Sequence, residues 1–122
     1  MGKIRNYKDL EIWQRSISLI EAIYNVTKKF PKEETYGLIS QVRRAAVSIP
    51  SNIAEGFARF YNNEYKQFLF ISLGSCAELS TQLIIAKRLG YLENGKADIL
   101  LDEIEQISKM TMSLIKKLNS SD

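Results

Sequence analysis

Three arginines in one short segment have the residue type and the spacing to bind a ligand. Arg43, Arg44 and Arg59 lie in the run SQVRRAAVSIPSNIAEGFAR, and Lys66 follows it. Guanidinium groups hold phosphate and carboxylate groups through paired hydrogen bonds, and a lysine adds a compact positive charge. The four residues are therefore a candidate site for an anionic ligand such as a nucleic-acid phosphate. Of the four, we expect Arg43 and Lys66 to be more exposed than Arg44.

The same segment also permits a purely structural interpretation. At helical spacing its polar residues fall in one stripe, which contains Gln41, Arg44, Ser48, Asn52, Glu55 and Arg59. Glu55 precedes Arg59 by four residues, the favourable order for an ion pair along a helix. Glu78 is the only charged residue in the run FLFISLGSCAELSTQLIIA. If Glu78 is buried it needs a cation, which Arg44 or Arg59 would supply. The stripe is either an intramolecular network or an anion-binding surface, and both interpretations stay open.

The chain lacks the residues on which most catalytic sites depend. It contains no histidine and one cysteine, Cys76, so it cannot form a Ser-His or Cys-His pair or the usual zinc and di-iron sites. It has no glycine-rich phosphate-binding loop. Cys76 lies among apolar residues and is expected to be a small core residue. The sequence therefore predicts a protein that is not an enzyme and has no metal or cofactor.

Helices must position these residues, because no segment shows the alternation typical of a β-strand. Four helices are predicted, at residues 10–29, 35–60, 63–89 and 96–118. Short connections between long helices favour antiparallel neighbours. We therefore predict an all-α fold, an antiparallel up-down-up-down four-helix bundle that forms a single domain over residues 1–122.

Particular residues should set the ends of these helices. Asp9 is the predicted N-cap of the first helix, and either Asn62 or Asn63 that of the third. Gly90 should end the third helix in a left-handed conformation. The segment 91–95 should then form a turn, because it contains an Asn-Gly pair.

Pro50 lies inside the second predicted helix. It lacks an N–H group and its ring crowds the carbonyl of Ala46, so we expect a kink, with local hydroxyl groups or water bonding to the freed carbonyl. A break into two separate helices is the alternative. Three single glycines, Gly37, Gly56 and Gly74, are interpreted as points where helices pack closely.

Two of the predicted helices carry more apolar surface than one bundle can cover. The first has two neighbouring apolar rows, and the third is apolar almost all round. A membrane-spanning third helix is disfavoured, since Glu78, Gln82 and several small polar residues interrupt it. The excess apolar surface predicts a homo-oligomer in which bundles pack side by side, with no membrane.

Charge and cysteine content restrict the compartment and the partners. The 122-residue chain has a net charge of +3 and a pI of about 9.0, which permits an acidic partner without requiring one. One cysteine cannot form an internal disulfide, and the N-terminal run MGKIRNYKDL has no apolar signal segment. We therefore expect a cytoplasmic protein.

Three runs, DLEIWQRS, FPKEETYGLISQVRRAAVSIPSNIAEGFAR and FLFISLGSCAELSTQLIIAKRLGYL, resemble the four-helix-bundle family of 23S rRNA intervening-sequence proteins. The family's motif falls here on Gln41, Arg43, Arg44, Ser48, Pro50, Ser51, Asn52, Glu55, Gly56 and Arg59. The resemblance implies a four-helix bundle, a pentamer and no known enzymatic activity. A related branch, the accessory variability proteins of diversity-generating retroelements, forms pentameric barrels and binds nucleic acid and a reverse transcriptase.

Two functions from different classes follow. The first is that of a nucleic-acid-binding accessory protein, in which a ring of bundles presents arginines and lysines to RNA or DNA. The second is that of a scaffold or protein-interaction module whose polar stripe only organises its own assembly. Sequence alone identifies neither the nucleic acid nor a protein partner.

Overall fold

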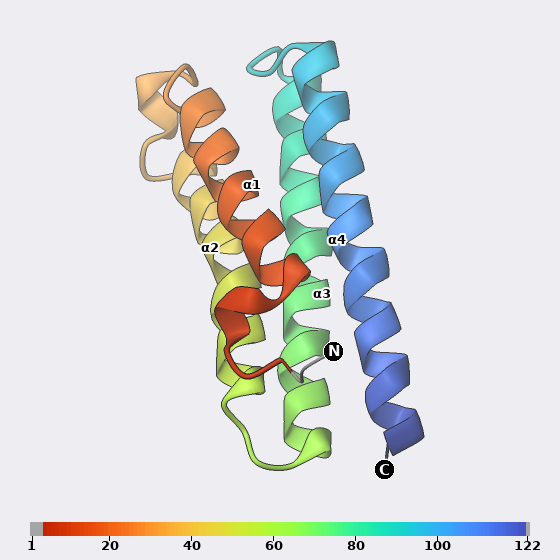
Figure 1. The fold of residues 1–122 in the computed structure, drawn as a ribbon. Helices are drawn as coiled ribbons and strands as arrows, with labels where there is room; N and C mark the ends of the chain where they lie inside the picture. The colour runs from red at the N-terminus through yellow and green to blue at the C-terminus, as the bar shows by residue number, and fades with distance from the viewer. Residues whose placement is uncertain (1–3, 122) are drawn as a thin grey trace.

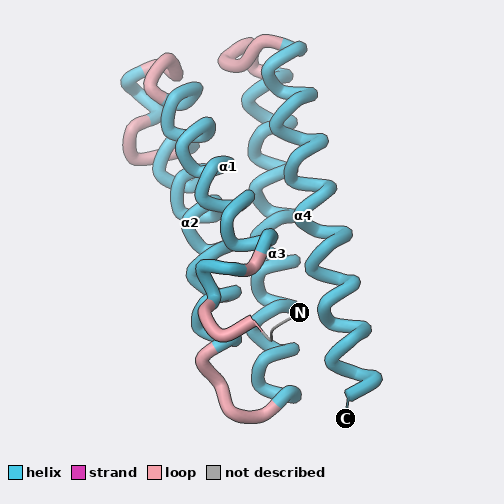
Figure 2. Tube along the Cα trace, in the orientation of Figure 1, coloured by secondary structure: helices cyan, strands magenta, loops and turns pink. Residues whose placement is uncertain are grey.

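Four long α-helices make up most of the chain (Figure 1). The computed structural model describes residues 4–121. Its helices are α1 (Glu11–Thr27), α2 (Leu38–Phe57), α3 (Asn62–Arg88) and α4 (Asn94–Ser121), with short 3₁₀ turns η1 (Tyr7–Asp9) and η2 (Lys32–Glu34). Figure 2 shows short loops between the helices and no strand within the described residues. The all-α four-helix prediction is therefore confirmed.

Each helix packs beside two others and opposite the fourth. α2 contacts α1 and α3, and α4 contacts α3 and α1, so the four helices form a closed ring in cross-section. In Figure 1 consecutive helices run in opposite directions, and the connections alternate between the two ends of the bundle. As a result, the end of α1 lies at the same end of the molecule as the connection from α3 to α4.

The core is a single cluster that all four helices share. Its largest completely buried side chains are Ile23, Ile49, Ile53, Leu69, Leu79, Leu83, Ile104 and Ile107. α3 is the one described helix whose length and composition would also allow it to cross a membrane. Leu69, Leu79 and Leu83 are completely buried in the bundle, whereas Phe70 and Ile71 remain exposed, so the bundle buries only part of the apolar surface of α3.

The helix ends differ from the prediction at several positions. Asp9 is not an N-cap, because it lies in η1, where the side chain of Asn6 accepts the N–H of Lys8 at 2.9 Å. α1 begins after Leu10, which has an extended backbone and makes no side-chain capping hydrogen bond. Asn62 is already the first residue of α3. Backbone conformation rather than capping side chains sets these two starts.

The start of α2 was also predicted too early. The chain first forms η2, and the Glu34 carboxylate then accepts the N–H of Leu38 at 3.0 Å. This carboxylate satisfies one of the free N–H groups of the first turn, as an N-cap side chain would. Between α3 and α4, the turn predicted at 91–95 is shorter than expected, because Asn94 and Gly95 already belong to the first turn of α4.

The end of α3 was predicted correctly. Gly90 has a φ of +81°, the left-handed conformation that glycine adopts without strain. Its N–H donates to the carbonyl of Lys87 at 3.1 Å, and the N–H of Tyr91 donates to that of Ala86 at 2.9 Å. These two bonds form the Schellman arrangement, which satisfies free carbonyls and turns the chain sharply toward α4.

α2 passes through Pro50 as one continuous helix, so the alternative of two separate helices is wrong. Pro50 is buried, and the Ser51 hydroxyl next to it donates to the carbonyl of Val47 at 2.8 Å. From α3, the Ser72 hydroxyl reaches across to the carbonyl of Ile49 at 2.9 Å. Side-chain hydroxyls thus bond to two carbonyls in the turn of α2 that precedes the proline, those of Val47 and Ile49, and not to the Ala46 carbonyl that the sequence pointed to.

Gly56 is a point of close packing, as predicted, whereas Gly74 is not. A Cβ atom at Gly56 would lie 2.8 Å from the Cβ of Phe68 and 3.1 Å from the carbonyl oxygen of Tyr65, so α3 approaches the bare backbone there. Gly37 precedes α2, and a Cβ there would meet the Glu34 carboxylate at 2.8 Å. Gly74 faces open space on the outer side of α3.

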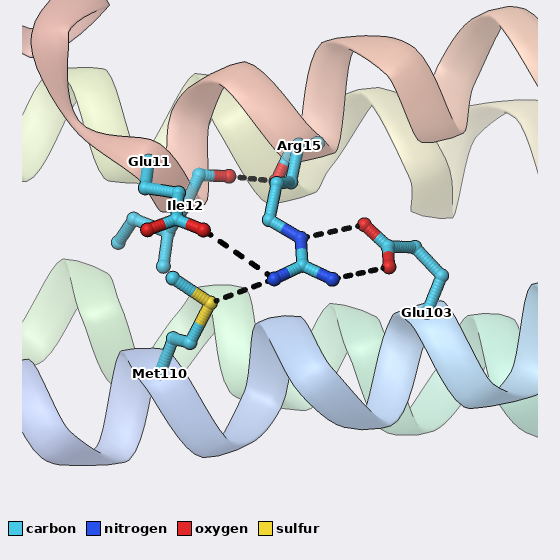
Figure 3. A network of polar contacts seen from close by, with 6 residues as sticks. Glu11, Ile12, Arg15, Glu103 and Met110 are labelled. Carbon is cyan, nitrogen blue, oxygen red and sulfur yellow. Dashed lines mark hydrogen bonds and ion pairs between the residues drawn. The ribbon is translucent and has the colours of Figure 1, made fainter.

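One ion pair connects α1 to α4 (Figure 3). The Arg15 guanidinium makes two parallel bonds to the Glu103 carboxylate, at 2.9 and 2.6 Å. The same guanidinium lies 3.5 Å from Glu11 and 3.4 Å from the sulfur of Met110. The hydrogen bond to Glu103, with the charges of both glutamates, raises the pKa of Arg15. The pair is bidentate, the strong geometry for an arginine and a carboxylate.

Candidate functional site

Arg43 connects α2 to α1. Its guanidinium carbon lies 4.3 Å from the centre of the Tyr24 ring, and its Nε donates to the Thr27 hydroxyl at 3.0 Å. The residue is half-buried, whereas Arg44 is exposed. The expected order of exposure is therefore wrong, because the face of α2 that carries Arg43 turns toward α1.

Arg59 follows the end of α2 and is held by its neighbours. Its guanidinium lies 3.3 Å from Glu55 and 3.8 Å from Glu64, and over the Phe68 ring at 4.7 Å. The predicted Glu55–Arg59 pair is confirmed. Because all three partners come from the ends of α2 and α3 that meet at this loop, Arg59 helps to fasten the loop.

Lys66 projects from α3 toward the last turns of α4. Its Nζ donates to the side chain of Asn119 at 2.7 Å, and the residue is half-buried rather than exposed. Arg43 thus joins α2 to α1, Arg59 lies at the loop between α2 and α3, and Lys66 joins α3 to α4. The structure does not bring the four predicted cationic residues together on one surface.

The middle of the polar stripe forms an intramolecular network. The Asn52 amide donates to the hydroxyl of Ser48 at 2.9 Å and to its carbonyl at 2.8 Å. The hydroxyls of Ser48 and Ser75 are 2.8 Å apart, which joins α2 to α3. At these positions the structural interpretation of the motif is supported.

Glu78 does not follow the prediction of a buried ion pair. It is exposed, and within the described residues it makes no ion pair with Arg44 or Arg59. The bundle covers only the inner side of α3, and Glu78 lies on the outer side next to α2. There it lines a pocket of about 170 Å³ whose other lining residues are Gln41, Arg44, Ala45, Ser48 and Gln82.

Two further clusters of cations, which the sequence analysis did not bring together, lie at one end of the bundle. We call the pocket of about 550 Å³ at this end the basic end pocket; it is lined by Val26, Lys29, Lys87, Gly90, Tyr91, Leu92, Glu93, Asn94 and Lys96. Exposed Lys28, Lys32 and Arg88 lie close to it in sequence. The sequence shows these cations as two separate clusters, and only the antiparallel course of the helices places them side by side.

Two of the three lysines that line the basic end pocket form ion pairs, and both pairs are solvent-exposed. Lys87 lies 3.3 Å from Asp98, and Lys96 lies 3.7 Å from Glu93. Lys29 makes no ion pair with a described residue. The Tyr91 hydroxyl donates to Glu34 at 3.2 Å, and loss of hydration together with this acidic partner raises the pKa of Tyr91. Tyr91 thus adds no charge at neutral pH to a pocket whose charged lining residues are three lysines and Glu93.

Other chemistry has little support in the described part of the chain. No group of three or more His, Cys, Asp or Glu side chains there could hold a metal ion. Cys76 is buried in the core, as predicted, and burial raises the pKa of its thiol, which opposes nucleophilic attack. The structure thus gives no indication of a catalytic centre in these residues.

Comparisons with known proteins identify the fold and, separately, the family. The structure is similar to the crystal structure of a protein of unknown function from the S23 ribosomal protein family of Bacteroides thetaiotaomicron, with a TM-score of 0.80 and 23% sequence identity. That likeness covers 86% of this chain and 98% of the other, and it supports the fold. No curated protein matches the chain. The family model of the 23S rRNA-intervening sequence protein matches residues 8–113. The chain therefore belongs to the 23S rRNA-intervening sequence protein family.

Proposed function

We propose that this protein is a non-enzymatic, self-associating helical bundle of the cytoplasm that binds the phosphate backbone of nucleic acid through its basic end pocket. The observation that carries the proposal is the meeting of two cation clusters, one after α1 and one between α3 and α4, around a single pocket. Lys29, Lys87 and Lys96 line this pocket from three different segments. Their convergence offers a polyanion several contacts at once.

The existing ion pairs would not prevent such binding. The pairs of Lys87 with Asp98 and of Lys96 with Glu93 are solvent-exposed, and exposed pairs contribute only about 0–1 kcal/mol each. A phosphate group can therefore compete for both ammonium groups. The pocket also contains the start of α4, whose free N–H groups favour negative charge.

Binding of this kind should depend on salt and not on base sequence. Lysine contacts to phosphates release counterions but read no base edges. Self-association would strengthen it, since a ring of five chains, the number that the family resemblance suggests, would present the pocket five times. A single chain with a net charge of +3 would hold a polyanion weakly by comparison.

The test is a titration of fluorescent RNA and DNA with the intact oligomer at several salt concentrations. Log affinity should fall by about 0.7–0.9 per phosphate contacted for each log unit of salt. The double variant Lys29→Ala/Lys96→Ala should flatten this slope. Lys109→Ala/Lys116→Ala is the matched control, because it removes the same charge from exposed positions on α4 outside the pocket.

Equal losses in both double variants would mean that net charge alone, not the basic end pocket, attracts nucleic acid. Absence of binding at roughly 50 mM salt, where the electrostatic attraction is strong, would favour the second candidate, a scaffold. That candidate has its own support. Arg43 and Arg59 are engaged within the chain, and the Ser48–Asn52–Ser75 network joins helices rather than facing a ligand.

A further inference from the structure

The small pocket between α2 and α3 contains polar groups that the bundle leaves without partners. It measures about 170 Å³ and is separate from the basic end pocket. Arg44 and Gln41 line it from α2, and Glu78 and Gln82 line it from α3. Within the described residues, these four side chains make no hydrogen bond or ion pair. The hydroxyl of Ser48, which also lines the pocket, does make hydrogen bonds.

Gln82 is the strongest sign that the pocket is incomplete. The residue is only 6% exposed, and its carbonyl oxygen Oε1 is buried with no hydrogen-bond partner among the described residues. Buried polar atoms are nearly always hydrogen-bonded in folded proteins. An amide kept at this position without a partner inside the bundle indicates that a donor comes from outside it.

Arg44 and Glu78 carry opposite charges on neighbouring helices and line the same pocket without pairing with each other. Elsewhere in the molecule a comparable pair, Arg15 and Glu103, closes into a bidentate bond. The pocket thus keeps one positive and one negative group facing a common space. A ligand with both charges would satisfy both groups, whereas an anion alone would meet the Glu78 carboxylate.

We propose that this pocket binds a small zwitterion, a free α-amino acid with a small side chain. Its carboxylate would accept from the Arg44 guanidinium and the Gln41 amide. Its ammonium would donate to the Glu78 carboxylate and, after rotation about the soft terminal torsion of Gln82, to that carbonyl oxygen. A terminus of a peptide chain carries only one of the two charges, so a free amino acid fits the pocket better.

Size and lining restrict the ligand further. The pocket measures about 170 Å³, which is enough for an amino acid as small as glycine or alanine. The lining has no aromatic ring, so a nucleobase would find no stacking partner there. The site is therefore independent of the proposed nucleic-acid contact.

The experiment titrates the intact oligomer with glycine and alanine, at concentrations up to several millimolar, by calorimetry and by amide chemical shifts. Acetate and methylammonium, which each carry one of the two charges, serve as comparison ligands. We expect saturable binding of the two amino acids, with shifts at α2 and α3 around the pocket, and at least about tenfold weaker binding of either single-charge ligand. Equal binding of acetate or methylammonium, or no binding of glycine, would overturn the proposal.

Variants identify the pocket. Arg44→Gln and Glu78→Gln should each weaken glycine binding at least about tenfold, while Arg88→Gln and Glu21→Gln, equal charge changes at exposed sites outside the pocket, should not. Gln82→Leu should also weaken binding and raise the melting temperature of the unliganded protein, because it removes the unpaired oxygen. If the leucine variant does not fold, Gln82→Met is used in its place. Glycine binding that survives Arg44→Gln, or a ligand-free Gln82→Met protein that is less stable than the parent, would contradict the assignment.

Discussion

Gly56 shows how one missing side chain sets the distance between two helices. A Cβ there would overlap the Cβ of Phe68 and press on the backbone of Tyr65, neither of which can move easily. We expect Gly56→Ala to lower the free energy of unfolding by about 1–3 kcal/mol, the usual cost of overpacking. Gly95→Ala, at an open position in the first turn of α4, is the control. Urea denaturation measures both, and equal effects in the two variants would mean that the close approach is not important.

We expect Tyr65 to make the stability of the protein sensitive to alkali. Burial raises its pKa to about 12 in the folded chain, against about 10 in the unfolded chain. The neutral phenol is thus favoured by folding, so its stabilising contribution is complete below pH 10 and is lost as the pH rises from 10 toward 12. Tyr65→Phe should make the stability curve flatter in that window.

Tyr36→Phe is the control for this measurement, because Tyr36 is almost completely exposed. Stability measured by denaturant titration between pH 9 and 11.5 should change slope only in Tyr65→Phe. A parent protein whose stability falls no faster than that of Tyr65→Phe would show that the Tyr65 phenol titrates normally.

Single residues were the least predictable part of this sequence. The spacing of Glu55 and Arg59 fixed their ion pair, because four residues along a helix determine a distance. Glu78 and Gly74 were predicted incorrectly because the sequence pattern of α3 is apolar on every side and does not tell which side faces its neighbours. The polar residues around Gln82 and the lysines of the basic end pocket come from different helices, so their meeting depends on tertiary contacts that the pattern of a single helix does not show.

The ion pair of Arg15 and Glu103 operates at the scale of elements, since it joins α1 to α4. Both side chains are about one-third exposed, so solvent reduces its strength. A double-mutant cycle with Arg15→Ala and Glu103→Ala should give a coupling energy of about 1 kcal/mol. The exposed pair of Glu105 and Lys109 within α4 should give only about 0.3–0.5 kcal/mol. A coupling no larger than that of the control would show that packing alone holds α1 against α4.

Helices as elements were predicted well, because four long segments have helical apolar patterns and glycine or proline near their ends. The end of α3 at Gly90 followed from glycine's access to positive φ. The starts of α1, α2 and α3 did not follow, since Leu10, Gly37 and Tyr61 precede them without side-chain caps. The extended backbone of Leu10 and Tyr61 leaves no signature in the residue type, and α2 takes its capping bond from Glu34, three residues before Gly37.

At the scale of the whole molecule, the outer side of α3 indicates self-association. Its exposed residues at helical spacing are Phe70, Gly74, Ala77, Thr81 and Ile84, and they form a stripe with no charge. Phe70 is 53% exposed, and the open space at Gly74 would allow another backbone to approach. A stripe of this kind is typical of a surface that another protein chain covers.

Light scattering should therefore report a multimer, with five copies of the 14.0 kDa chain as the expected number. Ala77→Glu places a charge in the centre of the stripe and should produce smaller species. Ser113→Glu, at an exposed position on α4, should not change the mass. A parent protein that stays monomeric at micromolar concentration would refute self-association.

The bonds between α2 and α3 also determine how the native protein opens. Ser72 and Ser75 reach across to α2, and Gly56 lets the two backbones come close, so these helices should behave as one cooperative unit. The last turns of α4, beyond the buried Ile115, have fewer buried contacts. In native-state hydrogen exchange, amides near Ile49 and Leu79 should exchange only through global unfolding, while those after Ile115 should exchange through local fraying. The α2–α3 hairpin would then be the last part of the molecule to lose its structure in rising denaturant.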